Sequence, residues 1–327
     1  MNLRDAADAV LEAPILTSFT KIGYAARKHL DEWTPVNSYD LRGRVIVLTG
    51  ATSGLGRAAA EQLARAGATL VLVGRGAEKN ERVVAEIVDA TENTRVTQVA
   101  ADMGDLDQVR ELARRVLAEH DRVDVLIHNA GALTADRRVA PDGTEATVAS
   151  QVVGPFLLTT LLLDRLAVSA PARVLTMSSG GMYTAPLSTA NLQMSEHDYK
   201  GAEQYARAKR AQVTLNEMWA ERFGDRGIHF HAMHPGWADT PGVEESLPIF
   251  SKVMGPLLRS PEQGADTLVW LAADAAPLES NGWFWLDRRP RSIHKLRRTK
   301  ASDTLERRRE LWDWVVLTSG EDPEVSL

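Results

Sequence analysis

The chain has 327 residues, of which 44% are hydrophobic, so it is long enough for one large domain with a sizeable core. Its formal net charge of −6 gives no indication of nucleic-acid binding. The absence of cysteine excludes disulfides, thiolate metal ligands and a cysteine nucleophile.

Residues 1–43 precede the first predicted strand and form an N-terminal extension. Apolar residues recur there at loosely helical spacing and predict one amphipathic helix: Val10, Leu11, Ile15, Leu16, Phe19, Ile22 and Tyr24. We expect this helix to dock on the domain surface, and a membrane-surface or partner-binding helix is the alternative. Arg4, Asp5 and Asp8 stand where the apolar part of a secretory signal would begin, so we expect a cytoplasmic protein.

Between residues 44 and 286 the pattern alternates between strands and helices. Strands are predicted at 45–49, 69–73, 95–100, 123–128, 172–177 and 228–233. Helices are predicted at 54–66, 77–90, 105–119, 142–168, 199–223 and 261–274. This alternation is typical of an α/β fold, a doubly wound parallel sheet with helices on both faces, in a single domain. The apolar run 152–163 is too short to span a bilayer and predicts a buried core helix.

Residues 287–327 form a basic C-terminal extension that ends in a predicted helix containing Trp312 and Trp314. Ten arginines and lysines lie between positions 288 and 309, and we expect most of them to be solvated surface. Contact with a cofactor phosphate, an anionic membrane or an acidic partner is the alternative. Trp283 and Trp285, near the last predicted strand, are expected to be core residues.

A glycine-rich turn follows the first predicted strand directly. The spacing is Gly50-x-x-x-Gly54-x-Gly56, and a helix begins at once. Glycines let a backbone approach a phosphate closely, and the N-terminus of a helix offers free N–H groups and a positive dipole end. The turn therefore predicts a site for the pyrophosphate of a dinucleotide.

Tyr205 and Lys209 lie four residues apart, on one face of a predicted helix. A nearby ammonium stabilises a phenolate, so the phenol exchanges a proton nearer neutral pH. Tyr24 and Lys28 repeat the spacing but precede the nucleotide fold, and we assign Tyr24 to packing. Tyr205 instead follows a strand that ends near Ser179, and sites in such sheets lie at the carboxyl ends of the strands.

In chain order, five motifs resemble those of the short-chain dehydrogenase/reductase family: Thr49-Gly50-x-x-x-Gly54-x-Gly56, Asn129-Ala130-Gly131, Ser179, Tyr205-x-x-x-Lys209 and Pro235-Gly236-x-x-x-Thr240. The segments around Ser178, His234, Gln263 and Asp287 also look like the subgroup of dehydrogenase/reductase SDR family member 12. The resemblance covers roughly residues 43–286 and implies a Rossmann-type fold and an oxidoreductase that interconverts a carbonyl and an alcohol.

The resemblance also implies residue roles. Tyr205 would be the general acid/base, Ser179 would hydrogen-bond the substrate oxygen, and Lys209 would hold the nicotinamide ribose. Asp102 would reach the adenine and Thr240 the nicotinamide carboxamide. The residues expected to contact the cofactor are Thr49, Gly50, Thr52, Ser53, Gly54, Leu55, Gly56, Arg75, Asp102, Met103, Asn129, Ala130, Gly131, Tyr205, Lys209, Pro235, Gly236 and Thr240.

Two features depart from the family pattern. Gln151 stands where the family usually has an asparagine that helps hold a proton-relay water, so the relay would be displaced, slowed or rebuilt. The interval of 26 residues between Ser179 and Tyr205 is about double the usual family spacing and predicts an inserted loop, at about 183–199.

The second predicted strand ends at Gly74-Arg75, without an acidic residue to bind a ribose 2′-hydroxyl. An arginine there can pair with a 2′-phosphate through its planar fork, which favours NADP(H) over NAD(H). No acidic cluster accompanies His229, His231 and His234, so we predict no metal site.

An apolar small-molecule substrate is favoured by residues expected near the nicotinamide end, although each is also a plausible core residue: Met182, Tyr183, Trp237, Phe250, Met254 and Leu257. The first reading is an NADP(H)-dependent oxidoreductase. The alternative is an NADP(H)-binding sensor or scaffold with little turnover. Either a homodimer or a monomer is compatible with the sequence, and peripheral membrane contact is compatible but has no direct support.

Overall fold

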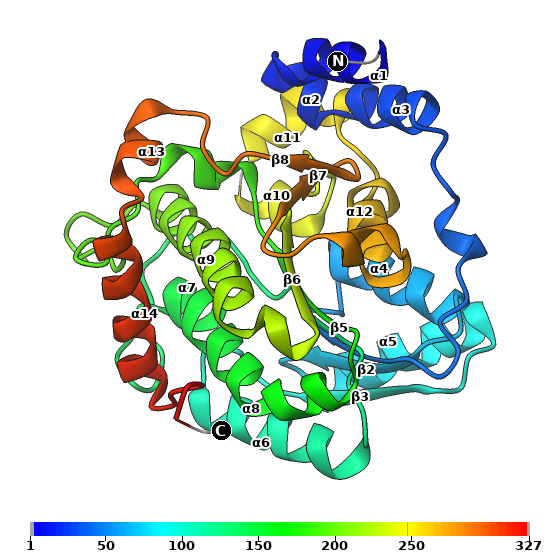
Figure 1. Ribbon diagram of the computed structural model, residues 1–327, viewed down its shortest axis with the longest axis horizontal. Helices are drawn as coiled ribbons and strands as arrows, with labels where there is room; N and C mark the ends of the chain where they lie inside the picture. The colour runs from blue at the N-terminus through cyan, green and yellow to red at the C-terminus, as the bar shows by residue number, and fades with distance from the viewer. Residues whose placement is uncertain (1–2, 247, 326–327) are drawn as a thin grey trace.

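A computed structural model describes residues 3–246 and 248–325 of the chain, and strands alternate with helices from residue 45 onward (Figure 1). The strands are β1 (Val45–Thr49), β2 (Thr69–Gly74), β3 (Val96–Ala100), β4 (Val125–His128), β5 (Ala172–Met177), β6 (Ile228–Met233), β7 (Phe284–Leu286) and β8 (Arg289–Arg291). They form one sheet in the order β3-β2-β1-β4-β5-β6-β7-β8, in which only β8 runs antiparallel to its neighbour. The predicted doubly wound parallel sheet is confirmed.

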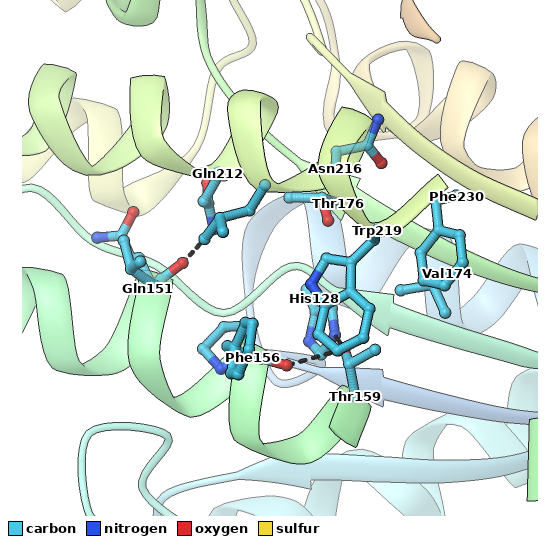
Figure 2. Close-up of a pocket in the computed structure, with 13 residues that line it drawn as sticks. His128, Gln151, Phe156, Thr159, Val174, Thr176, Gln212, Asn216, Trp219 and Phe230 are labelled. Atoms are coloured by element: carbon cyan, nitrogen blue, oxygen red, sulfur yellow. Dashed lines mark hydrogen bonds between the residues drawn. The ribbon is translucent and has the colours of Figure 1, made fainter. Parts of the chain in front are cut away.

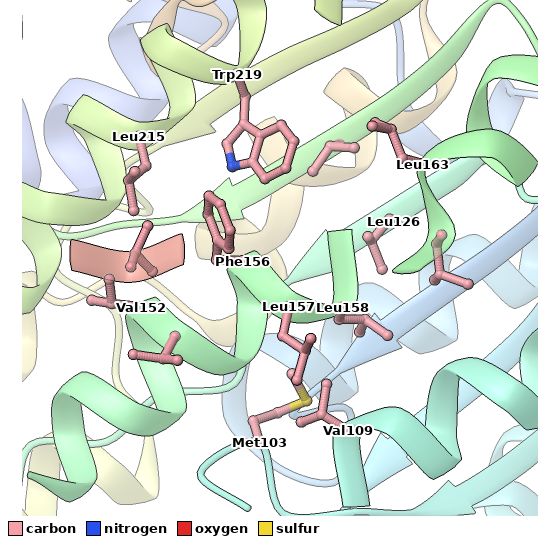
Figure 3. Packing of buried hydrophobic residues seen from close by; sticks show 14 of the residues in the cluster. Met103, Val109, Leu126, Val152, Phe156, Leu157, Leu158, Leu163, Leu215 and Trp219 are labelled. Atoms are coloured by element: carbon pink, nitrogen blue, oxygen red, sulfur yellow. The ribbon is translucent and has the colours of Figure 1, made fainter. Parts of the chain in front are cut away.

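The sheet is covered on both faces because successive side chains of each strand point to opposite sides. Ile46 and Leu48 pack in a cluster with α4 (Gly54–Arg65), α5 (Ala77–Thr91) and α12 (Pro261–Ala273). Val47 packs in the other cluster, with α6 (Leu106–Glu119), α8 (Gly154–Val168) and α9 (Gly201–Phe223). Figure 3 shows part of this second cluster, where Leu157 and Leu158 of α8 lie beside Leu126 of β4.

The longest apolar segment forms a continuous helical stretch of 23 residues, Ala146–Val168. It consists of α7 (Ala146–Val148), one π-helical turn (Ala149–Val153) and α8. Its mean hydropathy of 1.6 and its length would suffice to cross a membrane, but 78% of its most apolar window is buried within the protein. The segment is a helix of the protein core, as the sequence predicted.

The N-terminal extension contains three helices, so the prediction of one amphipathic helix is wrong. They are α1 (Leu3–Glu12), α2 (Ile15–Phe19) and α3 (Lys21–Leu30), followed by a short 3-10 turn at Val36–Ser38. Pro14 and Thr20 both have extended backbone dihedrals and separate the helices. A proline restricts the residue before it to extended conformations, which explains the first break.

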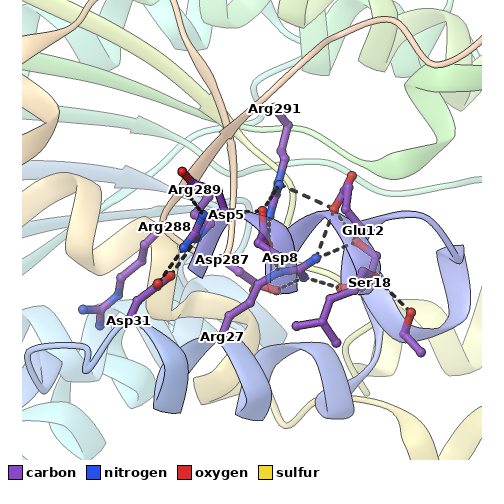
Figure 4. A network of polar contacts seen from close by, with 12 residues as sticks. Asp5, Asp8, Glu12, Ser18, Arg27, Asp31, Asp287, Arg288, Arg289 and Arg291 are labelled. Carbon is purple, nitrogen blue, oxygen red and sulfur yellow. Dashed lines mark hydrogen bonds and ion pairs between the residues drawn. The ribbon is translucent and has the colours of Figure 1, made fainter. Parts of the chain in front are cut away.

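The basic C-terminal extension is only partly solvated, which corrects the expectation for its first residues (Figure 4). Arg289 pairs with Asp31 and Arg291 with Asp8, each at 2.6 Å, and Lys295 lies 2.5 Å from Glu12. Arg288 pairs instead with Asp266 of α12 at 2.8 Å. Most basic residues further along are exposed, as expected: Arg297, Arg298, Lys300, Arg307 and Arg309. Arg308 is instead half-buried and pairs with Asp303 and Glu217. The acidic groups that meet the start of this segment therefore include several from the N-terminal extension.

Near the end of the sheet, Trp285 is buried, as predicted, but Trp283 is 47% exposed, so its assignment to the core is wrong. Trp283 precedes β7, and its indole only flanks that of Trp285, at 5.6 Å between ring centroids. Two short helices, α10 (Pro241–Ser246) and α11 (Pro248–Met254), lie between β6 and α12. Residue 247, between them, lies outside the described residues.

After α13 (Arg297–Ser302), the last helix α14 (Leu305–Ser319) packs against α8 and α9. Its Trp312 is buried, with ring centroids 5.1 Å from those of Phe156 and Trp219. The guanidinium of Arg222 covers the Trp312 ring at 4.3 Å. The predicted terminal helix thus closes the side of the molecule formed by α8 and α9.

Replacing Trp312 by alanine should lower the free energy of unfolding by about 3–5 kcal/mol, because a large buried ring leaves a cavity between helices. Leu317→Ala is the matched control on the same helix, since Leu317 is 81% exposed, and it should change stability by less than about 0.5 kcal/mol. Urea unfolding followed by far-UV circular dichroism measures both. Equal effects of the two substitutions would show that α14 is not anchored by Trp312.

Candidate active site

The glycine-rich turn after β1 is shaped by close approach of backbone to backbone. Gly50 has φ of +67°, and a Cβ atom there would lie 2.7 Å from the Cα of Ala130. A Cβ atom at Gly56 would lie 2.1 Å from the carbonyl oxygen of Gly50. Both distances are shorter than any tolerable contact, so only glycine allows β1, the turn and α4 to pack in this way.

The turn presents the N-terminus of α4 to solvent, which is the arrangement that a pyrophosphate requires. In the described structure Ser53 precedes the helix without a side-chain capping bond, and the first turn of α4 carries no acidic residue. Thr52 lies beside Gly74 at the end of β2, and Leu55, in the first turn of α4, packs against Gly264 of α12. The free N–H groups and the glycine cradle fit a dinucleotide phosphate.

Asn129 joins the ends of β1 and β4. Its Nδ2 donates to the carbonyl oxygens of Thr49 and Gly50, at 3.0 Å each. In return, the hydroxyl oxygen of Thr49 accepts hydrogen bonds from the backbone N–H groups of Asn129 and Ala130, both at 3.1 Å. Strand order reverses between β1 and β4, so these residues fix the crevice where ligands bind in open α/β sheets. Gly131, next along the chain, is exposed there.

Arg75, Asp102 and Met103 follow β2 and β3 at the same edge of the sheet. Arg75 is exposed, and among the described residues its side chain has no hydrogen-bond or ion-pair partner. Asp102 is half-buried and its carboxylate accepts a hydrogen bond from the N–H of Gly104 at 2.9 Å, while the Met103 side chain is buried. The exposed guanidinium is therefore free to meet an anion beside the glycine turn.

Ser179, Tyr205 and Lys209 come together at the ends of β5 and α9. Ser179 begins the 3-10 turn Gly180–Thr184, and its hydroxyl accepts the N–H of Gly181 at 3.3 Å. The Lys209 ammonium lies 5.2 Å from the centroid of the Tyr205 ring and donates to the carbonyl oxygen of Met177 at 2.9 Å. Ser178 points away and donates to the backbone oxygen of Lys209, as strand alternation predicts.

Burial shifts both titratable groups of this trio toward their neutral forms. It raises the pKa of Tyr205 to about 12, so the expectation that Lys209 brings this pKa nearer neutrality is wrong; a hydrogen bond with Ser179 opposes the rise. Burial lowers the pKa of Lys209 to about 7. At neutral pH the phenol therefore carries its proton and can donate it to an oxygen placed between Ser179 and Tyr205.

Gln151 lies in the π-helical turn before α8, and its side chain is fully buried. Its Nε2 donates to the carbonyl oxygen of Ala132 at 2.9 Å, while its Oε1 has no hydrogen-bond partner in the described structure. The backbone oxygen of Gln151 accepts a 2.6 Å hydrogen bond from Nε2 of Gln212 on α9 (Figure 2). The glutamine side chain therefore lies against Gly131 and Ala132, after β4, while its backbone is tied to α9.

A cavity of about 30 Å³ lies beside Gln151, between α8, α9 and the sheet (Figure 2). Its polar lining includes His128, whose Nε2 lies 2.8 Å from the hydroxyl of Thr159 and whose pKa burial lowers to about 3. The walls are mostly apolar, but a space of this size can hold one water molecule where the polar side chains of the lining meet it.

Pro235, Gly236 and Thr240 follow β6 and complete the crevice. A Cβ atom at Gly54 would lie 3.3 Å from the Cβ of Thr240, so this segment reaches the glycine turn. Sequence reasoning missed two residues that hold it. The carbonyl oxygen of Phe19 accepts the N–H of Trp237 at 2.7 Å, and Arg259 donates to the carbonyl oxygen of Pro235 at 3.2 Å. Neither residue belongs to a local motif, so no sequence signal marks them.

The six apolar residues expected near the nicotinamide end divide into two groups. Met182 and Tyr183 are buried core residues. Trp237, Phe250, Met254 and Leu257 are half-buried, and the rings of Trp237 and Phe250 meet at 5.1 Å between centroids. Only this second group remains as a candidate apolar wall of a substrate pocket. Of the inserted loop predicted at 183–199, residues 183 and 184 belong to the 3-10 turn Gly180–Thr184, and 185–199 contain no helix or strand.

The three histidines of β6 and its end have separate surroundings. His229 and His231 contact the carbonyl oxygens of Ser280 and Pro277, each at 3.0 Å. His234 is buried near Gly180. Among the described residues, no group of three or more His, Cys, Asp or Glu side chains is placed to hold a metal ion. Tyr24 is buried and donates to Asp266 at 3.2 Å, which agrees with its assignment to packing.

Lys209→Met should make stability less dependent on pH above neutrality. The folded pKa of Lys209 is about 7, whereas an unfolded lysine titrates near 10, so between these values the unfolded state binds more protons. The wild-type free energy of unfolding should therefore rise with pH by up to about 1.4 kcal/mol per unit, relative to the variant. Urea unfolding near pH 7 and pH 9 measures this difference. A constant gap between the two proteins would contradict a neutral, desolvated Lys209.

Comparison with known proteins agrees with this geometry. Residues 44–248 match the family model described as short chain dehydrogenase. The chain is 38% identical over 293 residues to human dehydrogenase/reductase SDR family member 12, covering 89% of this chain and 91% of the relative. It is 32% identical over 291 residues to mouse retinol dehydrogenase 12, covering 85% of this chain and 92% of that one.

A solved structure shares the fold: a short chain dehydrogenase of Shigella flexneri in complex with NADP, with a TM-score of 0.61 and 25% identity. The match covers 76% of this chain and 98% of that one. The chain therefore belongs to the short-chain dehydrogenase/reductase family, enzymes that use a nicotinamide cofactor to act on CH–OH or C=O groups of small molecules.

Proposed function

We propose that this enzyme is an NADP(H)-dependent oxidoreductase that interconverts a carbonyl and an alcohol on an apolar small molecule, with Tyr205 as the general acid/base. The observation that carries the proposal is the grouping of Ser179, Tyr205 and Lys209 at the sheet edge that also bears the glycine turn. Sites of α/β sheets lie at this edge.

In the reducing direction, the neutral Tyr205 donates its proton to the substrate oxygen, and Ser179 hydrogen-bonds the same oxygen. Lys209 lies under the Tyr205 ring, and with a pKa of about 7 it can take up a proton near neutral pH; its ammonium form then stabilises the phenolate that the transfer leaves behind. The nicotinamide cofactor supplies the hydride when bound. In the oxidising direction the phenolate takes the proton back.

The proposed preference for NADP(H) is supported by Arg75. The β2 strand ends without an acidic residue that would bind the 2′-hydroxyl of NAD(H), and the Arg75 side chain is exposed at this end. A guanidinium binds a phosphate through two parallel hydrogen bonds. The NADP complex of the Shigella flexneri relative is consistent with this preference. Asp102 and Met103 are proposed to flank the adenine, and Pro235, Gly236 and Thr240 to hold the nicotinamide.

An apolar substrate is supported by the half-buried group of Trp237, Phe250, Met254 and Leu257 beside the proposed nicotinamide site. The name of the mouse relative, a retinol dehydrogenase, also refers to an apolar alcohol.

A second candidate function, nucleotide binding with little turnover, is favoured by one observation. The backbone oxygen of Gln151 already accepts a hydrogen bond from the amide of Gln212, and its side-chain amide donates to the carbonyl oxygen of Ala132, so fewer of its polar groups are left for the relay water that the family resemblance implies. A measurement of turnover in the wild-type enzyme separates the two candidates.

Tyr205→Phe should lower turnover at least about 100-fold, because the phenyl ring cannot donate a proton to the substrate oxygen. The dissociation constant for NADPH should change less than about twofold, because the glycine turn remains intact. Consumption of NADPH with a panel of apolar aldehydes and ketones measures turnover, and fluorescence titration measures affinity.

Tyr39→Phe is the matched control, since the Tyr39 hydroxyl donates to Asp274 and lies outside the proposed site. Its turnover should equal that of the wild type. Wild-type turnover in Tyr205→Phe would remove the proposed acid/base, and an inactive wild type that binds NADPH would favour the second candidate function.

A further inference from the structure

The N-terminal extension is fastened to the catalytic domain by a buried arginine (Figure 4). The side chain of Arg27 is fully buried, and its guanidinium lies 2.7 Å from both Asp8 and Asp287. It also donates to the carbonyl oxygen of Ser18 at 3.0 Å. Breaking a buried pair leaves an uncompensated charge, so this contact holds α1 and α2 firmly against the β7–β8 hairpin.

A second buried arginine links the same carboxylate to the loop after β6. Arg259 makes two hydrogen bonds to Asp287, at 2.6 and 2.9 Å, and donates to the carbonyl oxygens of Pro235 and Phe19 at 3.2 and 3.1 Å. A Cβ atom at Gly236 would lie 2.3 Å from the Arg259 guanidinium carbon, so the loop rests directly on this group. The N-terminal extension and the Pro235–Gly236 loop therefore share one anchor.

The ring of Phe19 projects from this anchor onto two segments of the proposed active site. Its centroid lies 4.4 Å from that of His234, edge to face, and 5.7 Å from that of Trp237. The same ring lies against Gly180, where a Cβ atom would lie 2.9 Å from the Phe19 ring and 3.0 Å from Nε2 of His234. Gly180 directly follows Ser179, and His234 directly precedes Pro235. The ring is thus packed against both the turn that carries Ser179 and the loop proposed to hold the nicotinamide, at the point where the two segments meet.

His234 depends on this packing. It is buried, and neither of its ring nitrogens has a hydrogen-bond partner among the described residues. Burial lowers the pKa of His234 to about 3, so its ring is neutral. The charged groups that face it are Arg259, Asp287 and Lys295, and the ammonium of Lys295 also lies over the Phe19 ring at 5.4 Å. Since no hydrogen bond fixes the imidazole, the contacts with Phe19 and Gly180 set its position.

We propose that Phe19 is a positioning residue of the active site: its ring sets the distance between the Ser179 turn and the Pro235–Gly236 loop, so the N-terminal extension is a working part of the catalytic centre. The inference rests on the proposed function, because it assigns the nicotinamide to the loop after β6. Loss of the ring opens a cavity between the two segments. A shift of about 1 Å in the nicotinamide or the substrate oxygen costs about 100-fold in rate.

The test compares Phe19→Ala and Phe19→Leu with Leu16→Ala, a control on the same helix at a side chain that is 49% exposed. Three quantities are measured at a temperature where every variant is folded. They are the dissociation constant for NADPH, the fluorescence lifetime of bound NADPH, which reports how rigidly the nicotinamide is held, and kcat and KM on the carbonyl panel.

For Phe19→Ala we expect a lifetime shorter than in the wild type and kcat at least about 10-fold lower, with the NADPH dissociation constant and KM changed less than about threefold. Phe19→Leu should be intermediate, because the larger side chain fills part of the cavity, and Leu16→Ala should match the wild type. A merely structural role would lower thermal stability without altering the lifetime of the bound cofactor.

Wild-type lifetime and kcat in Phe19→Ala would overturn the inference and leave the proposed function standing. If the wild type binds NADPH but turns over none of the panel, the lifetime of bound NADPH decides alone: a shorter lifetime in Phe19→Ala than in the wild type supports the inference, and equal lifetimes contradict it. A wild type that does not bind NADPH would contradict the proposed function and this inference together.

Discussion

The close approach of the backbone segments that follow β1 and β4 is the constraint on which the site depends. Asn129 donates to two consecutive carbonyl oxygens, and the absence of Cβ atoms at Gly50 and Gly56 lets the turn and α4 lie against them. Because strand order reverses here, the N-terminus of α4 points into a crevice at the surface rather than into the core. The proposed cofactor, Tyr205 and Ser179 all derive their relative positions from this edge.

Asp287 supplies a second constraint, which ties the N-terminal helices to that edge. It sits in the two-residue turn between β7 and β8 with φ of +55°, a left-handed conformation that aspartate tolerates. Its carboxylate meets both Arg27 and Arg259, and these arginines lower its pKa against the opposing effect of burial. A single buried anion thereby couples the N-terminal helices to the loop after β6.

Local pattern explains why most of the sheet and its motifs were predictable. The six predicted strands and the glycine turn each depend on residues close together in sequence, and Tyr205 and Lys209 are one helical turn apart. The remaining features depend on contacts between distant residues. Asp8 and Arg291 pair across 283 positions, so the basic C-terminal segment looked solvated, and Phe19 looked like any apolar residue of an amphipathic helix. Pro14 is a local signal for the break in that helix, but the prediction gave more weight to the apolar spacing.

The central claim, that the crevice beyond β1 and β4 binds NADP(H), is tested most directly by titrating the wild-type protein with NADPH and NADH in parallel. Quenching of the eight tryptophans reports binding of either nucleotide. We predict saturable binding of both, with a dissociation constant at least about 10-fold lower for NADPH, since an Arg75–phosphate pair contributes about 1.5–3 kcal/mol. Tighter binding of NADH would contradict the role of Arg75, and binding of neither nucleotide would contradict the account of the site as a whole.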